Sequence, residues 1–165
     1  LGLGDALAMV LMEEKEFSPE QFRRFHPGGS LGRRLALRVT DIMRVGDQIP
    51  VTRDSASLAD AIQEMSAKDL GTTLVVDADG LLTGILTDGD LRRFLQQGTA
   101  PSGTETVGSL MTGTPRTVEP DAMAVEALRI MEVNGIMTLA IVDTRGRPAG
   151  ITHLHDILGR GKFVL

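Results

Sequence analysis

The segment Gly84-Ile-Leu-Thr-Asp-Gly-Asp90 carries side chains suited to binding a phosphorylated sugar. Its pattern predicts that a strand ends here and that a helix follows. A helix N-terminus presents unpaired N–H groups and a partial positive charge, which favour a phosphate. Thr87 can donate its hydroxyl to a phosphate oxygen, whereas ionised Asp90 only accepts hydrogen bonds and so suits a ribose diol. Because the two side chains are three residues apart, they share one face of the first turn.

A second interpretation of Thr87 and Asp90 is that they only cap the helix, which is the usual role of such residues. The motif recurs 66 residues later as Gly150-Ile-Thr-His-Leu-His-Asp156, and this recurrence favours a ligand site. His153 replaces the hydroxyl in the second copy, so we expect one site to dominate. A metal site at His153 and His155 is a weaker alternative because no third ligand is evident. We expect no metal, and a ligand-facing or surface role for both histidines.

The motif is part of an internal repeat that organises most of the chain. Residues 51–94 align with 117–160 without a gap. A short lead-in also repeats, since Val39–Met43 resembles Val107–Met111 at an offset of 68. The identical pairs include Ala56/Ala122, Ala61/Ala127, Met65/Met131, Thr72/Thr138, Val76/Val142, Asp77/Asp143, Gly80/Gly146, Gly84/Gly150, Ile85/Ile151 and Asp90/Asp156.

Each copy predicts the order β-α-β-β-α. A short strand precedes a helix, then come a buried strand, a hairpin turn with Gly, a second strand and a final helix starting near Asp88 or Leu154. Ser57 and Asp60 predict a capping box for the first helix. The predicted buried helix faces are Leu58, Ala61, Ile62 and Met65 in the first copy and Ala124, Ala127, Leu128 and Met131 in the second. The fold class is therefore α/β (α+β), with two units about a pseudo-twofold axis.

The predicted organisation has four segments. Residues 1–37 lie outside the repeat, 38–98 form the first domain, 99–106 are a linker rich in Gly, Pro, Ser and Thr, and 107–165 form the second domain. The chain opens at Leu1, without an initiator Met and inside an apolar pattern, so we expect a fragment of a longer protein.

Composition excludes several function classes. The 165 residues include 22 acidic and 17 basic side chains, and a net charge of −5 argues against nucleic acid as the main partner. The absence of Cys excludes disulfides and a Cys-based zinc site, and it fits a cytoplasmic protein. No apolar run approaches the roughly 20 residues that span a bilayer, so we expect no membrane partner.

The pattern Gly-h-x-Thr/Ser-x-x-Asp, closing a β-α-β-β-α module in tandem, resembles the CBS domain pair. Such pairs bind adenosine or related nucleotides in the cleft between modules. The resemblance implies that Thr87 and Asp90 contact phosphate and ribose, that Gly84 is the motif glycine, and that Asp156 is the second carboxylate. It also implies base-facing positions at Val51, Thr52, Thr72 and Thr73.

The leading segment carries a second resemblance. Composition alone favours a tight turn at His26-Pro-Gly-Gly, with Ser30 capping a short helix. Gly-Asp-Ala-Leu-Ala, followed by Phe-x-x-x-His-Pro-Gly-Gly-Ser-Leu-Gly-Arg-Arg, resembles the end of the sugar-isomerase (SIS) domain in arabinose 5-phosphate isomerases. That family interconverts D-ribulose 5-phosphate and D-arabinose 5-phosphate for synthesis of the lipopolysaccharide sugar Kdo. The resemblance implies a catalytic role for His26 within an incomplete site, so we expect this chain alone not to be catalytic.

The leading hypothesis is a regulatory pair that senses a nucleotide for the isomerase and needs no cofactor. We favour CMP-Kdo, the end product, over AMP and ATP, with His153, His155 and Arg92 near its extra carboxylate. One alternative is a ligand-free scaffold that dimerises and holds the parent subunits together, since the family implies tetramers. Another is the CBS pair of a transporter or nucleotide dehydrogenase, against which the leading segment argues.

Overall fold

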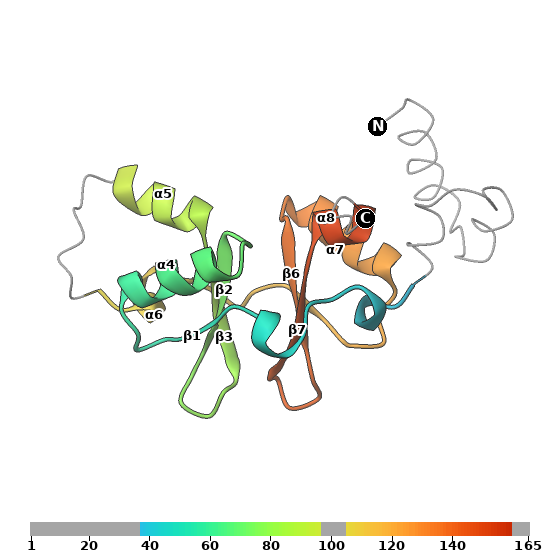
Figure 1. Cartoon of the computed structure of the whole chain (residues 1–165), viewed down its shortest axis with the longest axis horizontal. Helices are drawn as coiled ribbons and strands as arrows, with labels where there is room; N and C mark the ends of the chain where they lie inside the picture. The colour runs from blue at the N-terminus through green and yellow to red at the C-terminus, as the bar shows by residue number, and fades with distance from the viewer. Residues whose placement is uncertain (1–36, 97–104, 160–165) are drawn as a thin grey trace, which may run out of the picture.

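The computed structural model describes residues 37–96 and 105–159, which form two similar modules (Figure 1). Both modules have the predicted order β-α-β-β-α. Module 1 consists of β1 (Val51–Arg53), α4 (Leu58–Ala67), β2 (Thr72–Val76), β3 (Leu82–Thr87) and α5 (Asp88–Gln96). Module 2 consists of β5 (Thr117–Val118), α7 (Ala124–Asn134), β6 (Thr138–Val142), β7 (Pro148–His153) and α8 (Leu154–Leu158). The predicted isomerase remnant, apart from Leu37, and most of the predicted linker lie outside the described residues.

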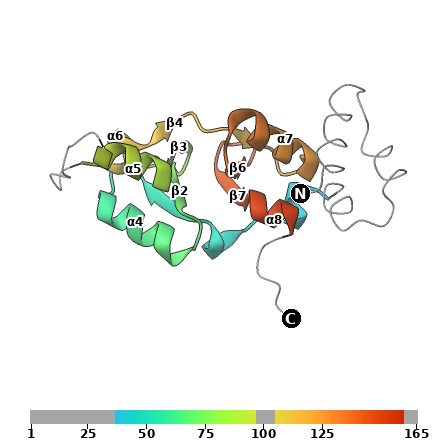
Figure 2. The same ribbon diagram turned by 90° about the horizontal axis from the view of Figure 1, so that it is seen from above.

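Each module builds one sheet with the same register. The first strand pairs parallel with the second, and the second pairs antiparallel with the third. Thr72 pairs with Thr87 in one sheet, and Thr138 pairs with His153 in the other. The strand register at the motif is therefore the same in both modules. The sheets lie at the centre of the molecule and the helices lie outside them (Figures 1 and 2).

The first helix of each module begins and packs largely as its sequence predicts. The Ser57 side chain accepts a hydrogen bond from the Asp60 N–H at 3.2 Å, and the Ser57 N–H donates to the Asp60 carboxylate at 3.3 Å. All four predicted core residues of α7 are buried. In α4 the prediction for Ile62 is wrong, because this side chain is 43% exposed at the margin of the packed face.

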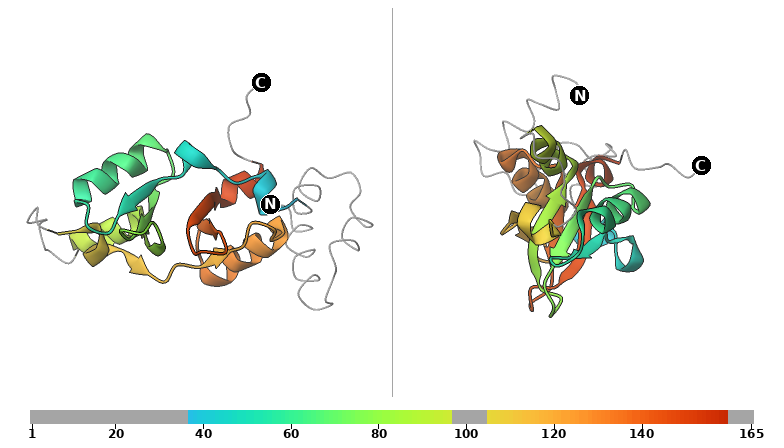
Figure 3. Two further views of the ribbon diagram at one scale, coloured as in Figure 1. Left: turned by 90° about the horizontal axis from the view of Figure 1, so that it is seen from below. Right: turned by 90° about the vertical axis from the view of Figure 1, so that its left-hand side faces the viewer.

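The lead-in segments pack on the opposite modules. The short helix η1 (Val39–Asp41) docks on module 2, where the Val39 N–H donates to the Ala122 carbonyl at 2.9 Å. Conversely, α6 (Val107–Leu110) docks on module 1, where the Gly108 N–H donates to the Asp54 carbonyl at 2.8 Å. Two chain segments therefore cross between the modules, on opposite sides of the molecule (Figure 3).

This exchange places apolar side chains of each lead-in in the core of the other module. Val39 is fully buried among α7 and β6 residues, and Val107 is fully buried beside Ala61 and Leu86. The predicted domains 38–98 and 107–165 follow the order of the chain, whereas the packing pairs each lead-in with the other repeat. A third cluster joins the sheets through Leu74, Ala140 and Ile151.

Two further short elements complete the crossings. After α6, β4 (Thr112–Gly113) adds a fourth strand beside β3. On the other side, Arg44 forms an isolated antiparallel bridge with Ile151 of β7, and η2 (Gly46–Gln48) follows it. Arg44 and Thr112 therefore occupy matching places at the two sheet edges.

Glycine is required where each lead-in methionine crosses a sheet. A Cβ on Gly84 would collide with Met111 Sδ, and a Cβ on Gly150 would collide with Met43 Sδ. At Gly150 the Arg44 carbonyl oxygen would also lie only 3.1 Å away. This oxygen is held in place because it accepts the Ile151 N–H at 3.1 Å.

We predict that Gly150→Ala lowers the free energy of unfolding by about 1–3 kcal/mol, because the added methyl overpacks the Met43 contact. Urea denaturation followed by circular dichroism measures the effect. Gly113→Ala is the matched control, since no heavy atom lies within 4 Å of a Cβ there. Equal stability of the two variants would contradict the close approach.

A buried hydroxyl in β7 gives a second stability prediction. Thr152 is fully buried and its Oγ1 has no hydrogen-bond partner, whereas the buried Thr73 hydroxyl bonds Thr52 Oγ1 at 2.8 Å. Thr152→Val should raise the free energy of unfolding by about 1–2 kcal/mol, because it removes an unsatisfied polar group. Thr73→Val should lower it, because Thr52 then loses its partner. Thermal and urea denaturation compare the two variants, and destabilisation by Thr152→Val would contradict the assignment.

Candidate functional site

Two pockets lie where the motif of one module meets the other module. The Thr87 pocket, of about 650 Å³, is lined by Thr87 and Asp90 on one side and by Met137, Thr138 and His153 on the other. The Arg44 pocket, of about 630 Å³, is lined by Arg44, Asp47, Gln48, Ala67, Lys68, Asp69, Leu70, His153, His155 and Asp156. Thr87 corresponds to His153 in the repeat, and Asp90 to Asp156, so the pockets are pseudo-symmetric mates.

Thr87 and Asp90 cap α5 and also line the Thr87 pocket. The Thr87 N–H and hydroxyl donate to Asp90 Oδ2 at 2.8 and 2.6 Å, and the Asp90 N–H donates to Thr87 Oγ1 at 3.3 Å. The capping interpretation is confirmed, and ligand contact by the same two residues stays a prediction. The reciprocal cap fixes the carboxylate at the pocket wall.

The second carboxylate oxygen of Asp90 lies in a polar network. Arg93, one turn along α5, forms an ion pair with Asp90 Oδ1, and Thr112 Oγ1 donates to the same oxygen at 3.3 Å. Across the pocket, Arg116 Nε donates to Asn134 Oδ1 at 3.1 Å. Arg93 and Arg116 thus place two guanidinium groups around the Thr87 pocket, where they favour an anionic ligand.

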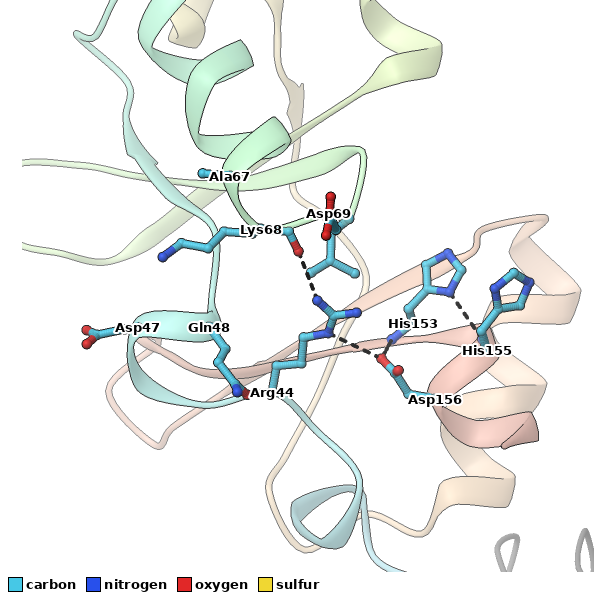
Figure 4. Close-up of a pocket in the computed structure, with 10 residues that line it drawn as sticks. Arg44, Asp47, Gln48, Ala67, Lys68, Asp69, His153, His155 and Asp156 are labelled. Atoms are coloured by element: carbon cyan, nitrogen blue, oxygen red, sulfur yellow. Dashed lines mark hydrogen bonds and ion pairs between the residues drawn. The ribbon is translucent and has the colours of Figure 1, made fainter. Parts of the chain in front are cut away.

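Arg44 links the modules at the other pocket (Figure 4). Its NH1 donates to the Lys68 carbonyl, at the end of α4, at 2.9 Å. Its Nε lies 3.7 Å from Asp156 Oδ2, at the start of α8. Thr112, the corresponding residue of the Thr87 pocket, has a shorter side chain that contacts Asp90. The two pockets therefore differ in the contact that spans the modules.

His153 caps α8 with its imidazole ring. Its Nδ1 accepts the His155 N–H at 3.1 Å, its backbone N–H donates to Asp156 Oδ2 at 3.1 Å, and its ring meets the His155 ring edge to face at 4.7 Å. Partial burial, followed by the charges of His155 and Arg44, lowers the pKa of His153 from its ordinary value of 6.5, while Asp156 opposes the shift. The neutral imidazole is therefore the favoured form.

The structure brings together some of the sequence-predicted residues and places others elsewhere. Thr72, Thr87, Asp90 and His153 line the Thr87 pocket, and His155 and Asp156 line the Arg44 pocket. Neither pocket is lined by Val51, Thr52, Thr73, Gly84 or Arg92.

Each of the other positions has a physical explanation. Thr52 and Thr73 bond each other between β1 and β2, and Gly84 gives space to Met111. Val51 and Arg92 are exposed. His26 lies outside the described residues. Within 37–96 and 105–159, no group of three or more His, Asp or Glu side chains is arranged to hold a metal ion.

Sequence reasoning missed the basic and amide residues that complete both pockets: Arg44, Lys68, Arg93, Arg116 and Asn134. A signal existed for Arg44, because the lead-in repeat at offset 68 aligns it with Thr112, beside the methionine. For Arg93 the signal is its spacing of three residues from Asp90 along a helix. Lys68, Arg116 and Asn134 lie at the ends of elements, and the sequence pattern does not indicate which ends meet at a pocket.

Comparison with known proteins places this architecture in a family. The sequence profile of the CBS domain matches residues 39–97 and 107–161. The chain belongs to the CBS domain family. This confirms the resemblance drawn from the repeat, and the two modules are CBS modules.

Curated relatives extend the match into the leading segment. Arabinose 5-phosphate isomerase KdsD of Pseudomonas aeruginosa is 47% identical over 161 residues, covering 98% of this chain and 49% of that protein. KdsD of Escherichia coli K12 is 42% identical over 161 residues, covering 98% and 48%. The chain spans about half the length of these relatives and corresponds to their C-terminal part.

Solved structures show the same fold. The plant CBS-pair protein CBSX2, from Arabidopsis thaliana, superposes with a TM-score of 0.66 at 25% identity, covering 76% of this chain and 94% of that chain. A structure of CBSX2 in complex with AMP gives a TM-score of 0.64 at 26% identity, covering 74% and 94%. Within the part that the structure describes, no helix is long and apolar enough to cross a membrane.

The lowered pKa of His153 predicts how stability depends on pH. In the unfolded chain His153 binds a proton with its ordinary pKa near 6.5, whereas in the folded chain its pKa is lower. Just below pH 6.5 the unfolded state therefore holds more protons than the folded state. Stability should therefore fall as pH drops below 6.5. Urea denaturation at pH 8, 7, 6 and 5.5 measures the free energy of unfolding. Its decrease toward low pH should be smaller in His153→Gln than in the unchanged protein. An identical pH profile for this variant would contradict the assignment.

Proposed function

We propose that this chain is the regulatory, nucleotide-binding CBS pair of an arabinose 5-phosphate isomerase. The parent enzyme would interconvert D-ribulose 5-phosphate and D-arabinose 5-phosphate in Kdo and lipopolysaccharide synthesis. The support is the similarity to KdsD over nearly the whole chain, including the leading segment with His26. On this proposal His26 belongs to the active site of the parent, a cytoplasmic tetramer. The CBS pair itself dimerises and requires no cofactor.

One observation carries the nucleotide-binding role. The capped pair Thr87–Asp90 lines a pocket of about 650 Å³ whose far wall comes from the other module. Pockets of roughly 300–1,000 Å³ hold small ligands in proteins. Asp90 accepts hydrogen bonds from a ribose diol, and the guanidinium groups of Arg93 and Arg116 suit phosphate oxygens. The Thr87 hydroxyl donates to a phosphate oxygen only when it turns away from Asp90 Oδ2. Binding would bridge the modules, so occupancy would alter how they sit together.

CMP-Kdo is the ligand that we favour for this pocket. Its ribose and phosphate match the Asp90 side, and its sugar acid adds a carboxylate that needs a donor farther away. His153 lies on the opposite wall and supplies such a donor, whereas His155 lines the other pocket and Arg92 lines neither. Regulation by the end product of the pathway would follow.

An adenine nucleotide is the second candidate. The observation in its favour is the structure of CBSX2 in complex with AMP, a protein 26% identical to this chain. AMP offers the same ribose and phosphate, but it has no second acidic group for the opposite wall. The affinity for CMP-Kdo should therefore depend on the wall from module 2 more than the affinity for AMP does.

We predict that CMP-Kdo at 100 times its dissociation constant stabilises the chain by about 2.7 kcal/mol. For a domain of this size that is a rise in Tm of roughly 5–10 °C. Differential scanning fluorimetry with CMP-Kdo, CMP, AMP and ATP compares the candidates. A larger shift with AMP or ATP would favour the adenine-nucleotide sensor.

Matched variants assign the shift to a pocket. Asp90→Asn keeps the size of the side chain but removes the charged acceptor, so the ligand-induced shift should disappear. Asp156→Asn makes the same change in the Arg44 pocket and should retain the shift. No shift with any nucleotide would favour a ligand-free scaffold, and a shift that survives Asp90→Asn would move the site elsewhere.

A further inference from the structure

His153 stands between the two pockets. His153 and Leu70 line both the Thr87 pocket and the Arg44 pocket, and of these two residues only His153 has a side chain that can donate a hydrogen bond or bind a proton. Thr87, its counterpart in module 1, lines only the Thr87 pocket of the two. At this position of the repeat, therefore, only the second module carries a titratable side chain.

The hydrogen bonds of His153 define what its ring offers a ligand. Nδ1 accepts the His155 N–H, so the neutral ring carries its proton on Nε2. Nε2–H is then the one donor of the ring, and it suits an anionic oxygen. A second proton can bind only at Nδ1, where it removes the acceptor of the His155 N–H.

Charged groups surround His153 from several elements. The carboxylate of Asp156 and the guanidinium of Arg44 are near neighbours with opposite effects on its charge, and His155 contacts its ring. The other charged groups of the two pockets are Asp47, Lys68, Asp69, Asp88, Asp90, Arg93 and Arg116. The surroundings of His153 thus carry charges of both signs. An added anionic group would stabilise the positively charged, protonated form of its imidazole.

We propose that His153 determines the specificity of the Thr87 pocket for a nucleotide with a second anionic group, and that this binding takes up a proton. The inference rests on the proposed nucleotide-binding function and names the group that selects the ligand. The anionic group favours the imidazolium form of His153 in the complex, whereas the free protein holds the ring neutral. Affinity therefore rises as pH falls toward 6.

Proton uptake also connects the pocket to the link between modules. A proton on Nδ1 displaces the His155 N–H and loosens the first turn of α8. That turn carries Asp156, which holds Arg44, and Arg44 donates to the Lys68 carbonyl of module 1. The residue before Arg44 is Met43, which crosses the sheet at Gly150. Binding at one pocket is thereby transmitted through the other to the lead-in.

Isothermal titration calorimetry with CMP-Kdo tests the proposal. The phosphodiester and carboxylate of this ligand stay ionised from pH 6 to 8, so any change in bound protons belongs to the protein. Titrations in two buffers with different ionisation enthalpies should show net proton uptake near pH 7. The Kd should fall by about threefold or more from pH 7.5 to 6.0, within the limit of about tenfold per pH unit for one linked proton.

Two variants assign the proton to one histidine. His153→Gln keeps an amide donor and a side-chain acceptor but cannot titrate, so proton uptake and the pH dependence of Kd should both disappear. Its preference for CMP-Kdo over CMP should also shrink. His155→Gln is the matched control, because His155 lines the Arg44 pocket but not the Thr87 pocket. This variant should still take up a proton when CMP-Kdo binds.

The outcomes separate this inference from the proposed function. Binding of CMP-Kdo with a Kd that stays constant from pH 8 to 6 would overturn the role of His153 and leave the nucleotide site intact. Proton uptake that persists in His153→Gln would do the same. Absence of binding by CMP-Kdo, CMP, AMP and ATP at every pH would overturn both proposals.

Discussion

The exchange of lead-in segments is the constraint on which the rest of the structure depends. Met43 and Met111 each cross the sheet of the opposite module at a glycine, and Val39 and Val107 fill the opposite cores. These contacts fix the distance between the two sheets. The pockets exist because the chain then places the motif of one module against the crossing segment that precedes the other.

The two pockets share one architecture and differ in chemistry. At the Thr87 pocket, the cap pair and two arginines present an acceptor and cationic groups, and Thr112 is too short to span the modules. At the Arg44 pocket, a guanidinium spans them between the Lys68 carbonyl and Asp156. The two modules share one frame, and they differ at positions 44, 112 and 153, where Arg44 links one pocket to the lead-in and Thr112 makes no such link at the other.

Sequence reasoning predicted what depends on local order and missed what depends on assembly. The hairpin turns were predictable because Asp77 and Asp143 accept N–H groups two and four residues ahead, a purely local arrangement. The cap of α5 was predictable for the same reason. The base-facing assignments to Val51, Thr52 and Thr73 came from resemblance, and these side chains lie in or beside the β1–β2 pairing. Periodicity gave no sign of the exchange, because a repeat is equally regular whichever module its lead-in contacts.

The crossing of the lead-ins has a consequence for how such chains assemble and evolve. One repeat in isolation lacks the apolar segment that completes its interior, so gain or loss of repeats is expected in pairs. Two molecules can also satisfy the same contacts by trading lead-ins, which makes a domain-swapped dimer a low-cost alternative to the closed monomer. Leu37 accepts the Ala124 N–H at the start of α7, and η1 follows shortly after it, so displacement of η1 would open the hydrophobic interior of the second module rather than the first.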